Sequence, residues 1–147
     1  IAFPMLEEWR NRGGTGVIML VDIDKMKTIN DVYGHSNGDL ALRTVASVLK
    51  SGLPEDWIVS RYGGDEFFVC GRLHGQEVDL DDLRSSLEKR LAREVKKREL
   101  EFPLSISIGT ARMKPEDTIE ISEYLQKADD DMYEIKQAHH KMLEQKE

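Results

Sequence analysis

The stretch of sequence that decides the fold is Arg61-Tyr62-Gly63-Gly64-Asp65-Glu66-Phe67, in which two carboxylates directly follow two glycines. Glycine adopts backbone angles that other residues avoid, so the pair predicts a tight turn. The apolar run that follows predicts a buried strand from Glu66 to Gly71, and Trp57 to Arg61 predicts its hairpin partner. Such a turn delivers Asp65 and Glu66 to a sheet edge, where carboxylates are suited to hold a divalent cation.

A second acidic segment, Asp22-Ile23-Asp24, closes the apolar run from Val17 to Val21. This run does not alternate, which is typical of a central strand buried on both faces. If the hairpin pairs beside it, Asp22, Asp65 and Glu66 converge at one end of the sheet. Converging carboxylates raise one another's pKa unless a cation neutralises them, and their oxygens suit Mg²⁺ or Mn²⁺.

Each of these acids also has a purely structural interpretation. Asp24 is placed to cap a helix N-terminus, and the others are ordinary exposed turn residues. For any single acid that interpretation is favoured. The combination of acids with a double glycine favours the metal site instead.

The remaining patterns predict helices and one more strand around the hairpin. Leu104 to Gly109 alternates strictly, which predicts a half-exposed strand. Hairpin strands beside a central strand imply one α+β domain, residues 1–147, with a mainly antiparallel or mixed sheet packed with helices. Five helices are expected. The first two cover residues 2–12 and 25–33, and the third begins at Gly38-Asp39 and ends at 51–54. The last two cover 80–97 and 121–138, with a fraying tail at 145–147.

Composition narrows the classes of protein. The chain has 147 residues, 39% of them hydrophobic, and a formal charge of −7, which disfavours a general nucleic-acid binder. The single cysteine, Cys70, is expected to be a small buried hydrophobe. Because no apolar stretch approaches membrane-spanning length, we expect a cytoplasmic domain without membrane contact. The abrupt start at Ile1 suggests a domain excised from a longer protein.

Two further groups of polar residues lie between the acidic segments. Lys25 and Lys27 stand where a strand leads into a helix, a place that can cradle phosphates, although solvated lysines are the simpler interpretation. Asn30, His35 and Asp39 recur at short spacing, and a carboxamide with a carboxylate can recognise guanine. On spacing alone, helix capping by these residues is favoured.

Taken together, these segments resemble the diguanylate cyclase, or GGDEF, family. The signature turn is intact at Gly63-Gly64-Asp65-Glu66-Phe67, preceded by the usual Arg61-Tyr62. The pattern D-x-D-x-F-K…N-D-x-x-G-H-x-x-G-D is matched from Asp22 to Asp39, apart from Met26 in place of phenylalanine. Ser105 to Gly109 is similar to the family's late strand, and Ala128 to Lys136 to its last helix.

The resemblance implies a palm-like, ferredoxin-like nucleotidyl cyclase fold and condensation of two GTP into cyclic di-GMP with loss of pyrophosphate. It also implies a homodimer, because each domain binds one GTP, and an upstream sensor domain in the full-length protein. The implied roles are metal binding by Asp22, the Ile23 carbonyl, Asp65 and Glu66; catalysis by Asp65, Glu66 and Lys27; and substrate binding by Asn30, His35, Asp39, Lys136, Gly63 and Gly64.

The sequence departs from the family pattern in two further places. The family's Lys-x-x-Gly-Arg reads Lys136-Gln137-Ala138-His139-His140, so a phosphate-binding arginine is replaced by His140, which lacks the bidentate fork. The inhibitory Arg-x-x-Asp position reads Pro54-Glu55-Asp56-Trp57, so the product-inhibition site is absent.

These departures leave rivals to the cyclase interpretation. The first is a GTP-binding regulatory module without turnover, which His140 favours and the intact Asp65-Glu66 disfavours. A cyclase of altered base choice is disfavoured by Asp39, and a product-sensing receptor by the missing Arg-x-x-Asp motif.

Overall fold

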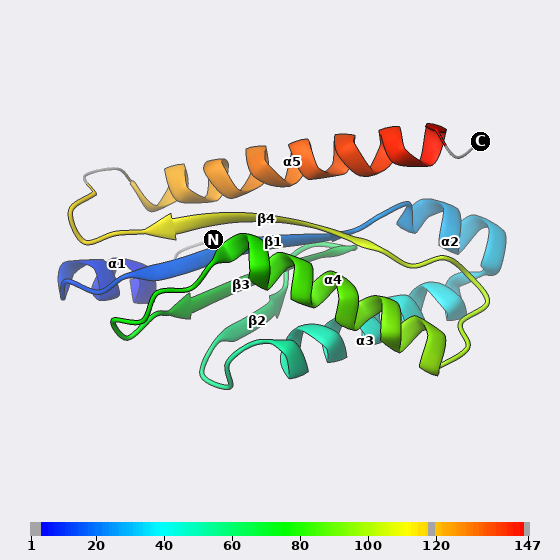
Figure 1. Ribbon diagram of the computed structural model, residues 1–147, viewed down its shortest axis with the longest axis horizontal. Helices are drawn as coiled ribbons and strands as arrows, with labels where there is room; N and C mark the ends of the chain where they lie inside the picture. Colours follow the sequence, from blue (N-terminus) through cyan, green and yellow to red (C-terminus); the bar gives the residue numbers. More distant parts are fainter. Residues whose placement is uncertain (1–3, 118–119, 146–147) are drawn as a thin grey trace.

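The computed structural model describes residues 4–117 and 120–145 and contains one antiparallel sheet of four strands (Figure 1). The strands are β1 (Gly16–Ile23), β2 (Ile58–Arg61), β3 (Glu66–Arg72) and β4 (Ile106–Met113), in the spatial order β2-β3-β1-β4. The helices are α1 (Pro4–Asn11), α2 (Met26–Tyr33), α3 (His35–Gly52), α4 (Leu80–Lys97) and α5 (Ile121–Gln145). The predicted α+β class, the hairpin and its pairing beside the central strand are confirmed.

The central strand β1 separates two hydrophobic cores, because successive side chains point to opposite faces. Val17, Met19 and Val21 pack with α2, α3 and α4, whereas Ile18 and Leu20 pack with α1 and α5. All eight residues of β1 are buried, as predicted for a strand covered on both faces. In Figure 1, α5 lies along one face of the sheet, and α3 and α4 lie along the other.

The predicted strand is confirmed from Ile106 onward, but the prediction that it is half-exposed is wrong. Strand β4 begins at Ile106, and its first four residues are buried. Ile106 and Ile108 face the α3–α4 core, whereas Gly109 lies directly under α5, where an added Cβ would sit 1.9 Å from the Ala128 carbonyl oxygen. Ser105, before the strand, is exposed, but Ser107 and Gly109 are buried, and Gly109 marks the close approach of a helix.

Helix boundaries also differ from the prediction. Helix α3 begins at His35 and not at Gly38, because Gly34, with φ of 89°, accommodates the whole reversal between α2 and α3. Strand β2 begins at Ile58, one residue after its predicted start at Trp57, and the Trp57 indole packs over Gly71. Helix α5 continues past Ala138 through Gln145; the rest of the expected fraying tail, and residues 2 and 3 of the first expected helix, lie outside the described residues.

The outer edge of β4 is capped by side chains of the two helices that flank it. The Arg84 guanidinium of α4 donates to the Ile108 carbonyl oxygen at 3.0 Å, and the Thr110 amide donates to the Asp131 carboxylate of α5 at 2.9 Å. Arg84 and Asp131 are also paired with each other at 2.8 Å. These contacts satisfy outward-facing backbone groups that an edge strand otherwise leaves open.

Candidate active site

The acidic residues of the two predicted segments meet at one end of the sheet. Asp22, near the end of β1, lies opposite Glu66 at the start of β3, and Asp65 directly precedes β3. One carboxylate oxygen from each of these three residues lies within 4.8 Å of the other two. The Ile23 amide donates to the Asp65 carbonyl oxygen at 3.2 Å, which fixes the turn to the strand end. The predicted convergence is confirmed.

The charge of this cluster is poorly solvated. Burial raises the pKa of Asp22 to about 6, the neighbouring Lys136 opposes the shift, and Asp65 and Glu66 add to it. Burial also raises the pKa of Glu66, with Asp65 and Asp129 contributing. Burial alone would lower the pKa of Lys136, but its ion pair with Asp22 raises it. The cluster therefore carries more negative charge than its surroundings compensate.

The residues fit a divalent cation. The Asp22 Oδ1 atom is buried and has no hydrogen-bond partner, although an unpaired buried carboxylate oxygen is costly. A Mg²⁺ or Mn²⁺ ion takes carboxylate oxygens as ligands and would remove both the unpaired acceptor and the repulsion. An unpaired, buried carboxylate oxygen beside two further carboxylates is thus an arrangement suited to binding a divalent cation.

The glycine turn leaves open space beside its backbone. Gly63 has φ of 87°, and a Cβ added at Gly63 or Gly64 would meet nothing within 4 Å. The turn is closed by the Tyr62 amide, which donates to the Glu66 carbonyl oxygen at 2.8 Å, and by the Arg61 guanidinium, which donates to the Gly64 carbonyl oxygen at 2.7 Å. One backbone and one side-chain hydrogen bond thus hold the shape of the turn, and the glycines keep its outer side accessible.

The polar residues of the α2–α3 corner line a cavity of about 410 Å³ beside this turn. Its lining includes Asn30, His35 and Asp39 of the corner, Gly64 and Asp65 of the turn, and Lys27. Asn30 lies over Gly38, where an added Cβ would be 1.8 Å from the Asn30 Oδ1 atom. Asp65 of the acidic cluster and the polar corner therefore line the same cavity.

Helix capping does not explain the acids of these two segments. Because α3 begins at His35, Asp39 lies in its second turn and is not an N-cap. The N-cap of α2 is Lys25, with φ of 55° and no side-chain cap bond, so Asp24 does not cap that helix either. Lys25 itself stands outside α2, although a helix from Lys25 was predicted.

Asp24 instead belongs to a cluster that sequence reasoning missed. Its carboxylate accepts hydrogen bonds from the Ser105 and Ser107 hydroxyls at 2.7 and 2.6 Å. The His139 Nδ1 atom of α5 lies 3.2 Å from the Asp24 carboxylate and 3.2 Å from the Ser107 hydroxyl. The signals in the sequence were the Ser-x-Ser alternation of β4 and a histidine at position 139.

A second cavity, of about 440 Å³, lies on the α5 side of the site. It is lined by Asp24 and Lys25 from the strand end and by Lys136, Gln137, His139 and His140 from α5. Lys136 therefore joins the acidic cluster, through Asp22, to a wall that carries further basic side chains. Lys27, by contrast, faces the cavity of Asn30. The predicted phosphate-binding lysines lie on different sides of the site.

The fold is that of solved diguanylate cyclase domains. The GGDEF domain of DgcB from Caulobacter crescentus, solved in complex with c-di-GMP, superposes with a TM-score of 0.73 over 92% of this chain and 80% of its own, at 26% identity. The active GGEEF domain of a diguanylate cyclase from Vibrio cholerae gives a TM-score of 0.74 at 23% identity, covering 89% of this chain and 82% of its own. These likenesses confirm the predicted cyclase fold.

Sequence comparison identifies the family itself. The family described as "Diguanylate cyclase, GGDEF domain" matches residues 4–142, so the chain belongs to the GGDEF family. Diguanylate cyclase DgcZ of Escherichia coli K12 is 33% identical over 125 residues, which cover 82% of this chain but 40% of DgcZ. The chain thus spans less than half the length of this curated relative. Among the residues that the structure describes, no helix is long and apolar enough to cross a bilayer.

Proposed function

We propose that this domain is a metal-dependent diguanylate cyclase that condenses two GTP molecules into cyclic di-GMP and releases pyrophosphate. The observation that carries this proposal is the shared cavity, which is lined both by Asn30, His35 and Asp39 of the polar corner and by Asp65 of the acidic cluster. In this proposal, a guanine held by the polar corner directs its phosphates toward Asp65. Relatives named as diguanylate cyclases support the same activity.

Each residue has a role that its position supports. Asn30, His35 and Asp39 bind the guanine nucleoside, with the amide donating to base acceptors and the carboxylate accepting from base N–H groups. Gly63 and Gly64 let the phosphate chain approach the backbone, because neither position carries a side chain in the open space beside the turn. Lys27 and Lys136 neutralise phosphate oxygens from the two sides of the site.

Asp22, the Ile23 carbonyl, Asp65 and Glu66 would hold Mg²⁺ or Mn²⁺. Such an ion, when bound, lowers the pKa of a nearby hydroxyl and stabilises charge on phosphate oxygens. In the reaction, the 3′-oxygen of one GTP forms a bond to the α-phosphorus of the other, and the bond to pyrophosphate breaks. Asp65 accepts the proton of the 3′-hydroxyl, Glu66 supports the metal ligands, and Lys27 stabilises charge on the transferred phosphate.

Turnover requires a homodimer in this proposal. The resemblance to diguanylate cyclases implies one GTP per domain, so the second GTP is expected to come from a second copy of the domain facing the first. Control by an upstream sensor module, residence in the cytoplasm, and the absence of nucleic-acid and membrane partners remain predictions from the sequence.

The alternative is a GTP-binding regulatory module without turnover, and one residue favours it. His140 lies in the cavity beside Lys136, where the family's arginine would bind phosphate with a planar, always charged group. The experiment is to fuse the domain to a dimerising helix, add GTP and Mg²⁺, and measure cyclic di-GMP and pyrophosphate. Formation of both products supports the cyclase. Binding of GTP without product under these conditions refutes the cyclase proposal and supports the regulatory one.

A further inference from the structure

Between Tyr133 and Met142, α5 lies beside the site without a fully buried apolar side chain. Among the residues of this helix whose side chains are described, the buried ones are Ile121, Tyr124, Ala128 and Met132, all in its first half. From Tyr133 to Met142, the part whose side chains are described, no side chain is buried. Burial of apolar surface is the main force that holds a helix on a sheet. Beyond Met132, polar contacts must therefore contribute much of the attraction that holds the helix on the sheet.

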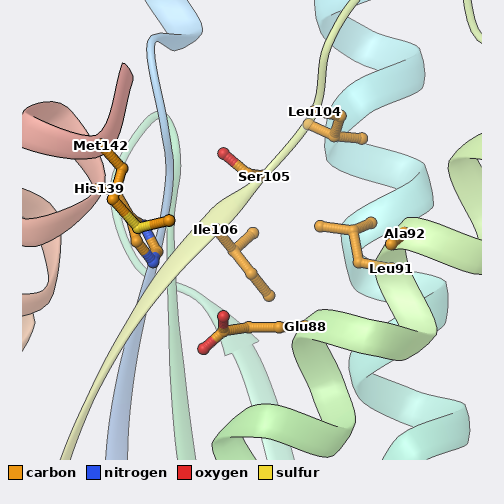
Figure 2. A pocket seen from close by; sticks show the side chains of 8 residues that line it. All are labelled: Glu88, Leu91, Ala92, Leu104, Ser105, Ile106, His139 and Met142. Atoms are coloured by element: carbon orange, nitrogen blue, oxygen red, sulfur yellow. The ribbon is translucent and has the colours of Figure 1, made fainter. Parts of the chain in front are cut away.

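Two polar contacts tie this half to the strand ends. Lys136 pairs with Asp22, and His139, three residues later on the same face, contacts Asp24 and Ser107. Figure 2 shows His139 and Met142 extending from α5 toward the start of β4, where Ser105 lies, across a cavity from α4. Lys136 and His139 thus reach the sheet from adjacent turns of the helix.

The partner of His139 is held firmly. Asp24 accepts from both serine hydroxyls, its amide donates to the Ser105 carbonyl oxygen at 2.9 Å, and its side chain is 11% exposed. Because the Ser107 hydroxyl donates to Asp24, its oxygen is free to accept from the His139 Nδ1–H group. A fixed carboxylate with such partners makes a strong, directional anchor.

The partner of Lys136, by contrast, is shared with the acidic cluster. Asp22 is one of the three carboxylates placed to hold a metal ion, whereas Asp24 is not among them. A cation bound at the unpaired Oδ1 atom of Asp22 would draw negative charge from the carboxylate that Lys136 contacts through Oδ2, and would repel the Lys136 ammonium. The ion pair between α5 and β1 should therefore weaken in the metal-bound state, in which Lys136 is proposed to contact the phosphates.

We propose that His139 is a positioning residue, which holds the second half of α5 against the sheet through its contacts with Asp24 and Ser107. It thereby keeps Lys136 on the phosphate side of the site when Asp22 binds the metal ion. This role rests on the proposed function. His139 acts through Lys136 and does not itself contact substrate. The family pattern has glycine at this position, so the anchor is a feature of this chain and not of the motif.

The first test measures amide hydrogen exchange of peptides from 133–145, with and without Mg²⁺. His139→Ala should exchange faster there than the wild type, and by a clearly larger factor when Mg²⁺ is present. His139→Asn, whose amide nitrogen can replace the Nδ1 donor, should restore protection. Glu134→Ala, an exposed change on the same helix, is the control and should leave the exchange of these peptides close to that of the wild type. Loosening that is equal with and without Mg²⁺, or no loosening at all, would overturn the proposal.

The second test is a double-mutant cycle on GTP affinity, measured by calorimetry. A hydrogen bond to a charged partner contributes about 1.5 kcal/mol, so His139→Ala should weaken GTP binding about tenfold. In a Lys136→Ala background the same substitution should cost less than about twofold, because the residue that it positions is gone. Equal losses in both backgrounds contradict the proposal. A wild-type chain that binds GTP but makes no product refutes the cyclase and leaves both tests valid.

Discussion

Replacing Gly38 by alanine should separate nucleotide binding from stability. The added Cβ would lie 1.8 Å from the Asn30 Oδ1 atom and 2.9 Å from its Cγ atom, about 1.5 Å or more short of ordinary contact at the oxygen. The Asn30 side chain is short and half-buried, so it can turn away. The backbone of Gly38 is helical and accepts alanine, which stabilises a helix by up to about 1 kcal/mol relative to glycine.

The expected loss follows from the hydrogen bonds that Asn30 can make to guanine. Two such bonds at about 1 kcal/mol each amount to about 2 kcal/mol, or GTP binding weakened about 30-fold. The melting temperature should stay the same or rise slightly. Calorimetry with GTP and Mg²⁺ measures the affinity, and thermal unfolding followed by circular dichroism measures the stability.

Controls distinguish this mechanism from a general disturbance of α3. Asn30→Ala should lose as much affinity as Gly38→Ala, and the double variant should lose no more than either, because both remove one interaction. Ser36→Ala, an exposed change in the same turn, should bind GTP normally. Unchanged GTP affinity in Gly38→Ala would refute the placement of guanine beside Asn30.

Four further predictions concern the acidic cluster, the sheet and α5. Asp65→Asn should keep the fold, because the Asp65 carboxylate is half-buried, but its rate of cyclic di-GMP formation should fall at least about a hundredfold. An unchanged rate would rule out the roles of Asp65 as metal ligand and base. The pKa of Asp22 rises from 3.8 to about 6 on folding, so the metal-free chain should lose up to about 3 kcal/mol of stability as the pH rises from 4 to 7. In urea unfolding, the free energy of unfolding of Asp22→Asn should not show this dependence on pH. Gly109→Ala, which forces a methyl group against the Ala128 carbonyl, should destabilise the fold by about 3 kcal/mol or more, and a smaller urea-midpoint change would argue against the close approach of α5. His140→Arg should tighten GTP binding several-fold by restoring a bidentate phosphate ligand, and an unchanged calorimetric affinity would show that His140 does not limit binding.

The core of the fold and the convergence of the acidic residues could be predicted from local sequence. The unbroken apolar run of β1 and the double glycine each indicate their own structure, and their pairing brings Asp22 and Glu66 opposite each other. What could not be predicted depends on contacts between distant segments. The alternation predicts that Ser107 faces solvent, because the sequence alone does not reveal that α5 lies over this strand, whereas Ser107 is buried. For the same reason the contact of Asp24 with His139 could not be predicted. Similarly, the start of α3 depends on one glycine at positive φ, Gly34, which removes the cap that Asp39 was expected to supply.

The capped edge of β4 has a consequence for how copies of this domain meet. An open edge strand invites a second chain to extend the sheet, and a sheet extended through two β4 strands would make a continuous ribbon of main-chain hydrogen bonds. Arg84 and Asp131 occupy the Ile108 carbonyl and the Thr110 amide, so that route is obstructed in the middle of the strand. Removing the cap, as in Arg84→Ala, should therefore expose this edge to pairing with other strands and promote aggregation. Arg84 and Asp131 thus protect the β4 edge of the sheet as well as joining α4 to α5.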